Sequence, residues 1–229
     1  MSIAERVSRF DDGYLDQLPG GAGRTAPRVP IDTQKATAGA VVFCPMLRAD
    51  GFRLAAWLCL ALHGSYGILG LVKDVAFPDP PWRRPQSLSS AVAVFVFPLG
   101  AYDLAPLVML TGLGRAVPGG RGTTSTLPAG VAAAGVARPP FGVLLHLGAR
   151  GPKGFVLAPQ RPRRLITDGF FAATRNPNDL GEIPIYSSFC LLAQHGLPSA
   201  ACATVWLQVF PPSMLRKDRS LSRDPERPA

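Results

Sequence analysis

Long apolar stretches that carry almost no charge alternate along this chain with blocks rich in charged residues. Only 17% of the 229 residues are charged, whereas soluble domains carry about 25%. Several of the apolar stretches reach the length of about 20 residues that a helix needs to cross a bilayer. Since a spanning segment must satisfy its own backbone hydrogen bonds, we expect these stretches to be helices. The sequence therefore predicts an all-α fold, a multi-pass transmembrane helical bundle.

Three segments have the length and composition of a membrane span, and a fourth region predicts a helical hairpin near the C-terminus. The predicted spans are residues 52–72, 88–114 and 127–149, and the predicted hairpin covers residues 180–215, with its turn near Gly196. The stretch 36–47 is apolar but short, so we expect it to be a partial or tilted span.

The basic residues predict the orientation of the bundle. If residues 36–47 cross the membrane, the N-terminus and the C-terminal tail share one side with the loops 73–87 and 150–179. That side carries most of the Lys and Arg residues, which places it in the cytoplasm by the positive-inside rule. We expect the endoplasmic reticulum or another internal membrane. The predicted regions are a poorly ordered tail at 1–30 without a cleaved signal, a membrane domain at 31–218 and a short tail at 219–229.

The net charge of +9 has three interpretations. Nucleic-acid-binding proteins are basic, but their basic stripe with aromatic or polar partners on a soluble fold is not found in this sequence, so we expect no nucleic-acid partner. A membrane surface rich in anionic lipid also attracts Lys and Arg. We favour basic loops that hold the topology. The four cysteines and three histidines lie singly in apolar stretches without metal-site spacing, which predicts packing residues and no metal site.

Two features inside the predicted spans suggest close packing or function. Gly64, Gly67 and Gly70 recur every three residues, which places small residues along one helix side where another helix can approach closely. The alternative is chance in a sequence rich in Ala and Gly. Asp103 is a carboxylate within a predicted span, and such a group normally faces the bundle interior and marks a functional site. The alternative is a position near the membrane interface.

Polar residues are densest at 164–182, just before the predicted hairpin. Asn178 or Asp179 is expected to cap a helix that begins near Leu180. Glu182 would then fall in the first turn, where the helix dipole favours a negative charge. This structural interpretation accounts for all three polar residues but leaves Arg175 unexplained.

The segment from Arg175 to Glu182, with the sequence RNPNDLGE, resembles the C-terminal signature of the steroid 5-alpha-reductase-like and isoprenylcysteine methyltransferase-like membrane enzymes. The flanking segments 165–171 and 185–189 are similar to the lead-in and hairpin of that family. The resemblance is strongest to proteins described by a 5-alpha-reductase C-terminal domain. It extends back to residues 62–67 and 77–80, with a gap across 115–140.

The resemblance implies an adenine-containing cofactor between the cytoplasmic ends of the last helices. Reductases of this kind use NADPH, and the methyltransferases use S-adenosylmethionine. A reductase would act on a double bond of a lipophilic, sterol-like substrate. Arginine suits bidentate phosphate contacts, which slightly favours NADPH. The resemblance implies cofactor contacts and no assigned catalytic residue, the contacts being made by Lys153, Arg164, Arg175, Asn178, Gly181 and Glu182.

Two departures from the family pattern weaken the expectation of catalysis. Asp179 replaces the tyrosine of the signature, and an ionised aspartate accepts hydrogen bonds but cannot donate one. Relatives usually continue past the position of Ala229 with aromatic residues that close the site. Three interpretations therefore stay open: an NADPH-dependent reductase, an S-adenosylmethionine-dependent methyltransferase, and a non-catalytic membrane protein on the same scaffold.

Overall fold

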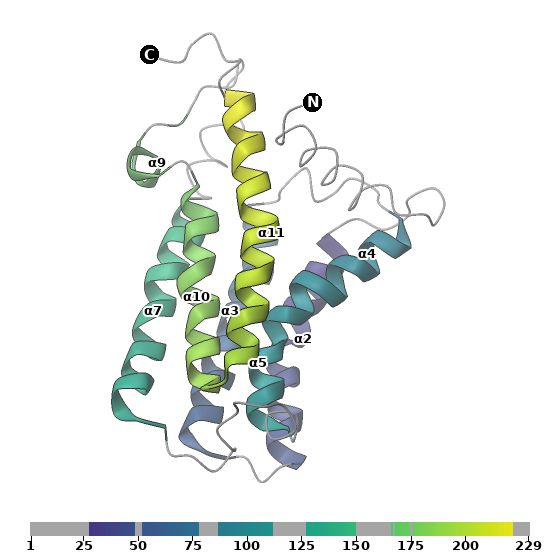
Figure 1. The fold of residues 1–229 in the computed structure, drawn as a ribbon, viewed down its shortest axis with the longest axis vertical. Helices are drawn as coiled ribbons and strands as arrows, with labels where there is room; N and C mark the ends of the chain where they lie inside the picture. The colour runs from purple at the N-terminus through teal and green to yellow at the C-terminus, as the bar shows by residue number, and fades with distance from the viewer. Residues whose placement is uncertain are drawn as a thin grey trace.

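The computed structural model describes residues 28–48, 52–77, 87–111, 127–149, 166, 168–174 and 176–221. Every regular element within these residues is helical (Figure 1). The elements are α2 Arg28–Arg48, α3 Leu54–Ala76, α4 Leu88–Val94, the π-helical stretch η2 Phe95–Leu99, α5 Gly100–Leu110, α7 Ala129–Gly148, α9 Phe170–Ala173, α10 Pro177–Ala193 and α11 Gly196–Leu221. The prediction of an all-helical fold is confirmed for the described part of the chain.

Three helical segments of the described chain are long and apolar enough to cross a membrane: Leu54–Ala76, Leu88–Leu110 and Ala129–Gly148. They correspond to the predicted spans 52–72, 88–114 and 127–149. The prediction of membrane-spanning helices is confirmed in this sense of length and composition. Many large apolar side chains on these helices point outward, among them Ile68 and Phe97, as expected for helices that face lipid.

Helix α2 is longer than its apolar stretch predicts. We expected a short span at 36–47, but the helix runs without interruption from Arg28 to Arg48 and packs along α3 and α5. Its first turns carry Gln34 and Lys35, which lowered the apparent apolar length in the sequence. Both side chains find polar partners inside the bundle, so the helix can bury them.

The segment from α4 through α5 bends away from the bundle at one end (Figure 1). Ser87 caps α4, since its hydroxyl accepts a hydrogen bond from the backbone N–H of Ser90 at 3.2 Å. Pro98 has no N–H to donate, and it lies in the π-helical stretch η2. At the end of that stretch the N–H of Gly100 bonds to the carbonyl of Phe95, five residues back. The wider turn accommodates the proline without ending the helix.

Helices α10 and α11 lie side by side and run in opposite directions (Figure 1). They are joined by Gln194, which adopts a left-handed conformation with φ of 48°, and by His195. The Nδ1 atom of His195 accepts a hydrogen bond at 3.0 Å from the backbone N–H of Leu197 at the start of α11. The turn therefore lies just before the predicted position at Gly196.

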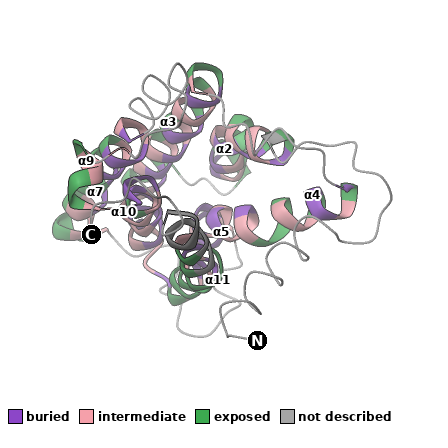
Figure 2. Ribbon diagram, turned by 90° about the horizontal axis from the view of Figure 1, so that it is seen from above, coloured by how far each residue is buried: buried purple, intermediate pink, exposed green. Residues whose placement is uncertain are grey.

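The buried faces of α3, α5, α7 and α10 turn toward the centre of the molecule (Figure 2). The main core combines residues of α3, α5, α10 and α11, including Ile185, Tyr186 and Phe189, which are almost completely buried. A second core joins α2, α3 and α5 around Val42 and Cys59. The main core contains tyrosines as well as aliphatic side chains, and these lead to the candidate site.

Candidate functional site

The start of α10 differs from the prediction. The helix begins at Pro177 rather than near Leu180, and the residue before it, Asn176, makes no side-chain capping bond. Proline suits the first helical position because its φ angle is already helical and its missing N–H would be unpaired there. Capping by Asn178 or Asp179 is therefore wrong, because both residues lie inside the helix.

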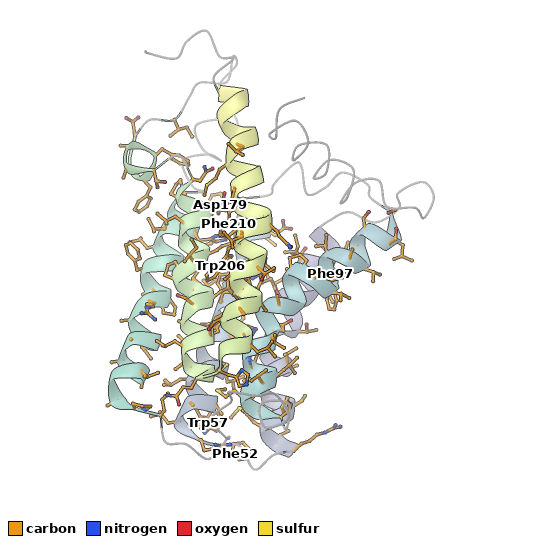
Figure 3. The ribbon with its side chains drawn as sticks, viewed as in Figure 1. Phe52, Trp57, Phe97, Asp179, Trp206 and Phe210 are labelled. Atoms are coloured by element: carbon orange, nitrogen blue, oxygen red, sulfur yellow. The ribbon has the colours of Figure 1, made fainter. Side chains whose placement is uncertain are left out.

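Asp179, not Glu182, is the acidic residue in the first turn of α10. Its carboxylate accepts a hydrogen bond at 3.3 Å from the side-chain amide of Asn178. Asp179 lies toward the end of the bundle from which the C-terminus leaves, whereas Phe52 and Trp57 lie at the opposite end (Figure 3). Glu182 lies about one turn deeper than Asp179, where it faces other helices.

Gly181 allows α10 to approach α7 closely. A Cβ atom on Gly181 would lie 2.5 Å from the carbonyl oxygen of Gly142 and 2.6 Å from the backbone nitrogen of His146. A Cβ atom on Gly142 would in turn lie 2.5 Å from the carbonyl oxygen of Gly181. Two backbones therefore meet here without a side chain between them. The structure gives Gly181 a packing role, and its predicted contact with a cofactor stays a prediction.

This close approach brings His146 of α7 against the first turns of α10. The Nδ1 atom of His146 donates a hydrogen bond at 3.1 Å to the backbone carbonyl of Asn178, which can only accept. The same atom lies 3.6 Å from a carboxylate oxygen of Glu182. The sequence interpretation of His146 as an isolated packing residue missed both contacts, since its partners lie on another helix.

Lys35 reaches from α2 into the centre of the bundle. Its ammonium nitrogen lies 2.9 Å from the hydroxyl of Tyr186 and 3.8 Å from the centre of the Tyr66 ring. A cation over an aromatic face is attracted by the ring quadrupole. Glu182 interacts electrostatically with the same ammonium group. Lys35 thus connects α2 with α3 and α10 through polar contacts.

Three tyrosines surround this contact. The rings of Tyr102 and Tyr186 are stacked, with centroids 3.6 Å apart and an interplanar angle of 9°. Tyr66 meets Tyr186 edge to face at a centroid distance of 5.5 Å. All three residues are buried, and the hydroxyl of Tyr186 has the ammonium group of Lys35 as a polar partner. A polar contact that is shielded from bulk water is electrostatically stronger than the same contact in water.

Asp103 faces the bundle interior, as one of the two interpretations predicted. One carboxylate oxygen accepts hydrogen bonds from the side-chain amide of Gln34 at 2.9 Å and from Nε2 of His63 at 3.0 Å. The carboxylate therefore links α5 to α2 and α3, and its depth in the membrane stays a prediction. The remaining polar atoms of its partners, Oε1 of Gln34 and Nδ1 of His63, are buried without a hydrogen-bond partner.

The polar and tyrosine side chains described above form one group of nine, which we call the interior polar cluster. They come from five helices, α2, α3, α5, α7 and α10. The cluster consists of Gln34, Lys35, His63, Tyr66, Tyr102, Asp103, His146, Glu182 and Tyr186.

Sequence reasoning found only two members of this cluster, Asp103 and Glu182. One signal was available for a third: Asn178, Glu182 and Tyr186 recur every four residues, which places them on one side of a helix. Of the six predicted cofactor contacts, the structure brings together Asn178, Gly181 and Glu182 on α10, whereas Lys153, Arg164 and Arg175 lie outside the described residues. No group of three His, Cys, Asp or Glu side chains within the described segments could hold a metal ion.

Comparisons with known proteins do not assign a family. No protein-family model, no curated protein and no solved structure matches this chain. Function is therefore inferred from the sequence signature and from the geometry of the interior polar cluster.

Proposed function

We propose that the protein is an NADPH-dependent membrane reductase that saturates a carbon–carbon double bond of a lipophilic, sterol-like substrate. The observation that supports this most strongly is the hydrogen bond between Lys35 and the buried hydroxyl of Tyr186. Reduction of a double bond adds a hydride and a proton to the substrate. The Tyr186 hydroxyl carries a proton that it can donate, and the ammonium group beside it would stabilise the tyrosine anion that results.

The arrangement in the membrane follows from the same proposal. Helices α3, α4 to α5 and α7 cross the bilayer, as does the hairpin formed by α10 and α11, and α2 completes the bundle. The basic loop before α10 then lies on the cytoplasmic side of an internal membrane such as the endoplasmic reticulum. This loop leads directly into the N-terminus of α10. A helix N-terminus favours anionic groups, so the phosphates of NADPH would bind near it.

The residues have different roles according to their depth in the bundle. When bound, NADPH supplies the hydride. Lys153, Arg164 and Arg175 neutralise its phosphates, and Asn178 at the start of α10 contributes a polar contact. Deeper in the bundle, Tyr186 donates a proton to the substrate, and Lys35 stabilises the tyrosine anion that results. Glu182 and His146 hold this end of the site in place through their mutual contact.

The first turn of α10 fits NADPH less well than the bundle interior does. The carboxylate of Asp179 lies there and would repel a phosphate. The same carboxylate would attract the positively charged sulfonium or amino group of S-adenosylmethionine. This observation favours a methyltransferase as the second candidate, although methyl transfer does not use a proton donor such as Tyr186. A catalytically inactive scaffold is the third.

Cofactor binding to the purified protein in detergent separates these candidates. We expect NADPH to bind with micromolar affinity in calorimetry and S-adenosylmethionine to bind more weakly or not at all. Binding of S-adenosylmethionine alone would make the methyltransferase the first candidate. If the folded protein binds neither cofactor, the inactive scaffold is favoured.

The arginine of the signature provides a sharper test of the cofactor site. Arg175→Ala should weaken NADPH binding by about 1.5–3 kcal/mol, the scale of a hydrogen bond to a charged group. Arg138→Ala is the matched control, because Arg138 is an exposed arginine on α7 outside the proposed site. Equal NADPH affinities of Arg175→Ala and Arg138→Ala would show that Arg175 does not contact the cofactor.

A further inference from the structure

The amine of Lys35 lies in unusual surroundings for a lysine. Its carbon chain runs over Gly70 of α3, where an added Cβ atom would lie 2.9 Å from Cδ and 3.1 Å from Cγ of Lys35. The glycine thus leaves a passage through which the amine reaches the aromatic rings. Its hydrogen-bond partner at the far end is the hydroxyl of Tyr186 rather than a carboxylate.

Such surroundings favour nucleophilic chemistry of the amine. A lysine on a protein surface is protonated and hydrated, and its nitrogen has no free electron pair. Removal from water favours loss of a proton from the ammonium group, and the neutral amine that results is the form that attacks carbonyl groups. The stacked rings of Tyr102 and Tyr186, with the Tyr66 ring set edge to face against Tyr186, provide an apolar surface beside the nitrogen, suited to the hydrocarbon part of a lipid.

The neighbouring groups match the requirements of imine formation. The Tyr186 hydroxyl lies at 2.9 Å from the nitrogen and can supply the proton that the departing oxygen needs. Asp103 and Glu182 both interact electrostatically with Lys35, and they would serve as counter-ions to a cationic adduct. A cation formed within a membrane protein needs such a counter-ion.

We propose that Lys35 forms a covalent imine with the carbonyl group of a lipophilic aldehyde or ketone. The inference names the substrate class of the proposed reductase and in that respect rests on the proposed function. Imine formation itself requires no cofactor, so the two proposals can fail separately. An imine conjugated with the double bond would also accept a hydride more readily than the free carbonyl compound does, because the cationic nitrogen withdraws electrons.

Imine formation proceeds through a carbinolamine. The neutral amine attacks the carbonyl carbon, a carbon–nitrogen bond forms, and one proton moves from nitrogen to oxygen to give a carbinolamine. The carbon–oxygen bond then breaks, and Tyr186 protonates the departing hydroxyl, which leaves as water. The products are a protonated imine on Lys35 and a tyrosine anion, and no atom is oxidised or reduced. A proton from the solvent restores the Tyr186 hydroxyl before it can donate to the substrate again. Addition of water by the reverse route releases the lipid.

The test traps the adduct. The full-length protein is reconstituted in phosphatidylcholine nanodiscs, since this lipid has no primary amine, and is incubated with hexadecanal and sodium cyanoborohydride. Peptide mass spectrometry then locates the hexadecyl group. We expect Lys35 to be modified at least tenfold faster than Lys73, a buried lysine of α3. Modification of Lys35 no faster than that of Lys73 would overturn the proposal without the need for any variant.

Two variants sharpen the result. Lys35→Arg keeps the positive charge but should abolish the adduct at this position, with the other lysines unaffected. Tyr186→Phe should slow trapping at Lys35 by about 100-fold, the lower end of the effect of a positioned general acid. An unchanged rate in Tyr186→Phe would remove the tyrosine from the step. Trapping at Lys35 by a protein that binds no NADPH would uphold the imine and refute the reductase, and the opposite result would refute the imine alone.

Discussion

Two helix pairs in this bundle approach closely through glycine, but they do so in different ways. Between α7 and α10, Gly142 and Gly181 each face the backbone of the other helix. Between α2 and α3, a Cβ atom on Gly67 would meet the backbone carbonyl oxygen of Lys35, one on Gly70 would meet the flexible carbon chain of Lys35, and one on Gly64 would lie 3.8 Å from the Cα of Gly39. The first pair depends on the absence of a side chain at both glycines, whereas the second depends on it at Gly67 and leaves room for adjustment at Gly64 and Gly70.

The second pair is held by polar contacts as well as by packing. Asp103 accepts hydrogen bonds from Gln34 on α2 and from His63 on α3, so one carboxylate links both helices to α5. The pair of α7 and α10 has the contact of His146 with Asn178, but this contact exists only because the backbones approach so closely. We therefore expect added volume to disturb the α7–α10 pair at both Gly142 and Gly181 but the α2–α3 pair only at Gly67, and we expect loss of a polar group to disturb the α2–α3 pair.

The largest effect is expected from Gly181→Ala. The new Cβ atom would meet backbone atoms of α7 at 2.5 and 2.6 Å, and backbone cannot rotate away as a side chain can. We expect a loss of about 3 kcal/mol of stability, at the upper end of the usual cost of overpacking. Thermal unfolding in a mild detergent, followed by helical circular dichroism, measures the loss. Gly130→Ala is the control, because no atom lies within 4 Å of a Cβ at that position.

Asp103→Ala is expected to have the next largest effect. It leaves the amide of Gln34 and the ring N–H of His63 buried without an acceptor, at a cost of about 2 kcal/mol. Asp103→Asn keeps an oxygen in the same place and should lose less than half as much. The same thermal unfolding measurement compares the two variants. Equal losses of stability would show that the charge of Asp103, rather than its acceptor oxygen, holds α2 and α3.

Gly70→Ala should change stability by less than about 1 kcal/mol, since the intrinsic helix preference of alanine offsets the displacement of a flexible side chain. The substitution should instead change the position of the Lys35 side chain. The carbon chain of Lys35 must move to make room, which takes the amine away from Tyr186. We expect unfolding near that of the wild type together with slower hexadecanal trapping at Lys35. Wild-type trapping would show that the glycine does not guide the lysine.

The smallest effect is expected from Gly64→Ala. A Cβ atom there would lie 3.8 Å from the nearest backbone atom, an ordinary van der Waals distance. The substitution should leave stability unchanged or raise it by up to about 1 kcal/mol through helix propensity. A loss as large as that of Gly181→Ala in the unfolding measurement would show that the two helix pairs do not differ in the way described.

The membrane-spanning candidates were predictable because their signal is local. A run of about 20 apolar residues predicts both a helix and a lipid environment for it. The predicted spans agree in position with the apolar helices of the structure. The glycine spacing in α3 also predicted correctly the side on which another helix packs. The extent of α2 was underestimated because Gln34 and Lys35 are polar, and only their partners on other helices explain why they are buried.

The interior polar cluster could not be predicted, because its contacts join distant parts of the sequence. Gln34 and Asp103 are 69 residues apart, and Lys35 and Tyr186 are 151 residues apart. No spacing rule within one helix can reveal such pairs. The start of α10 is a different case, since a proline after Asn176 was a readable signal for the first helical position.

The most direct test of the account is transfer of hydrogen from NADPH to a lipid. Purified protein is incubated with a total membrane lipid extract and with NADPH that carries deuterium at either face of carbon 4, and lipids that gain one deuterium and one proton are sought by mass spectrometry. The account predicts labelled lipids from one of the two cofactor forms with the wild-type protein and none with Lys35→Met. Binding of NADPH without any labelled lipid, or equal labelling by the Lys35→Met variant, would contradict it.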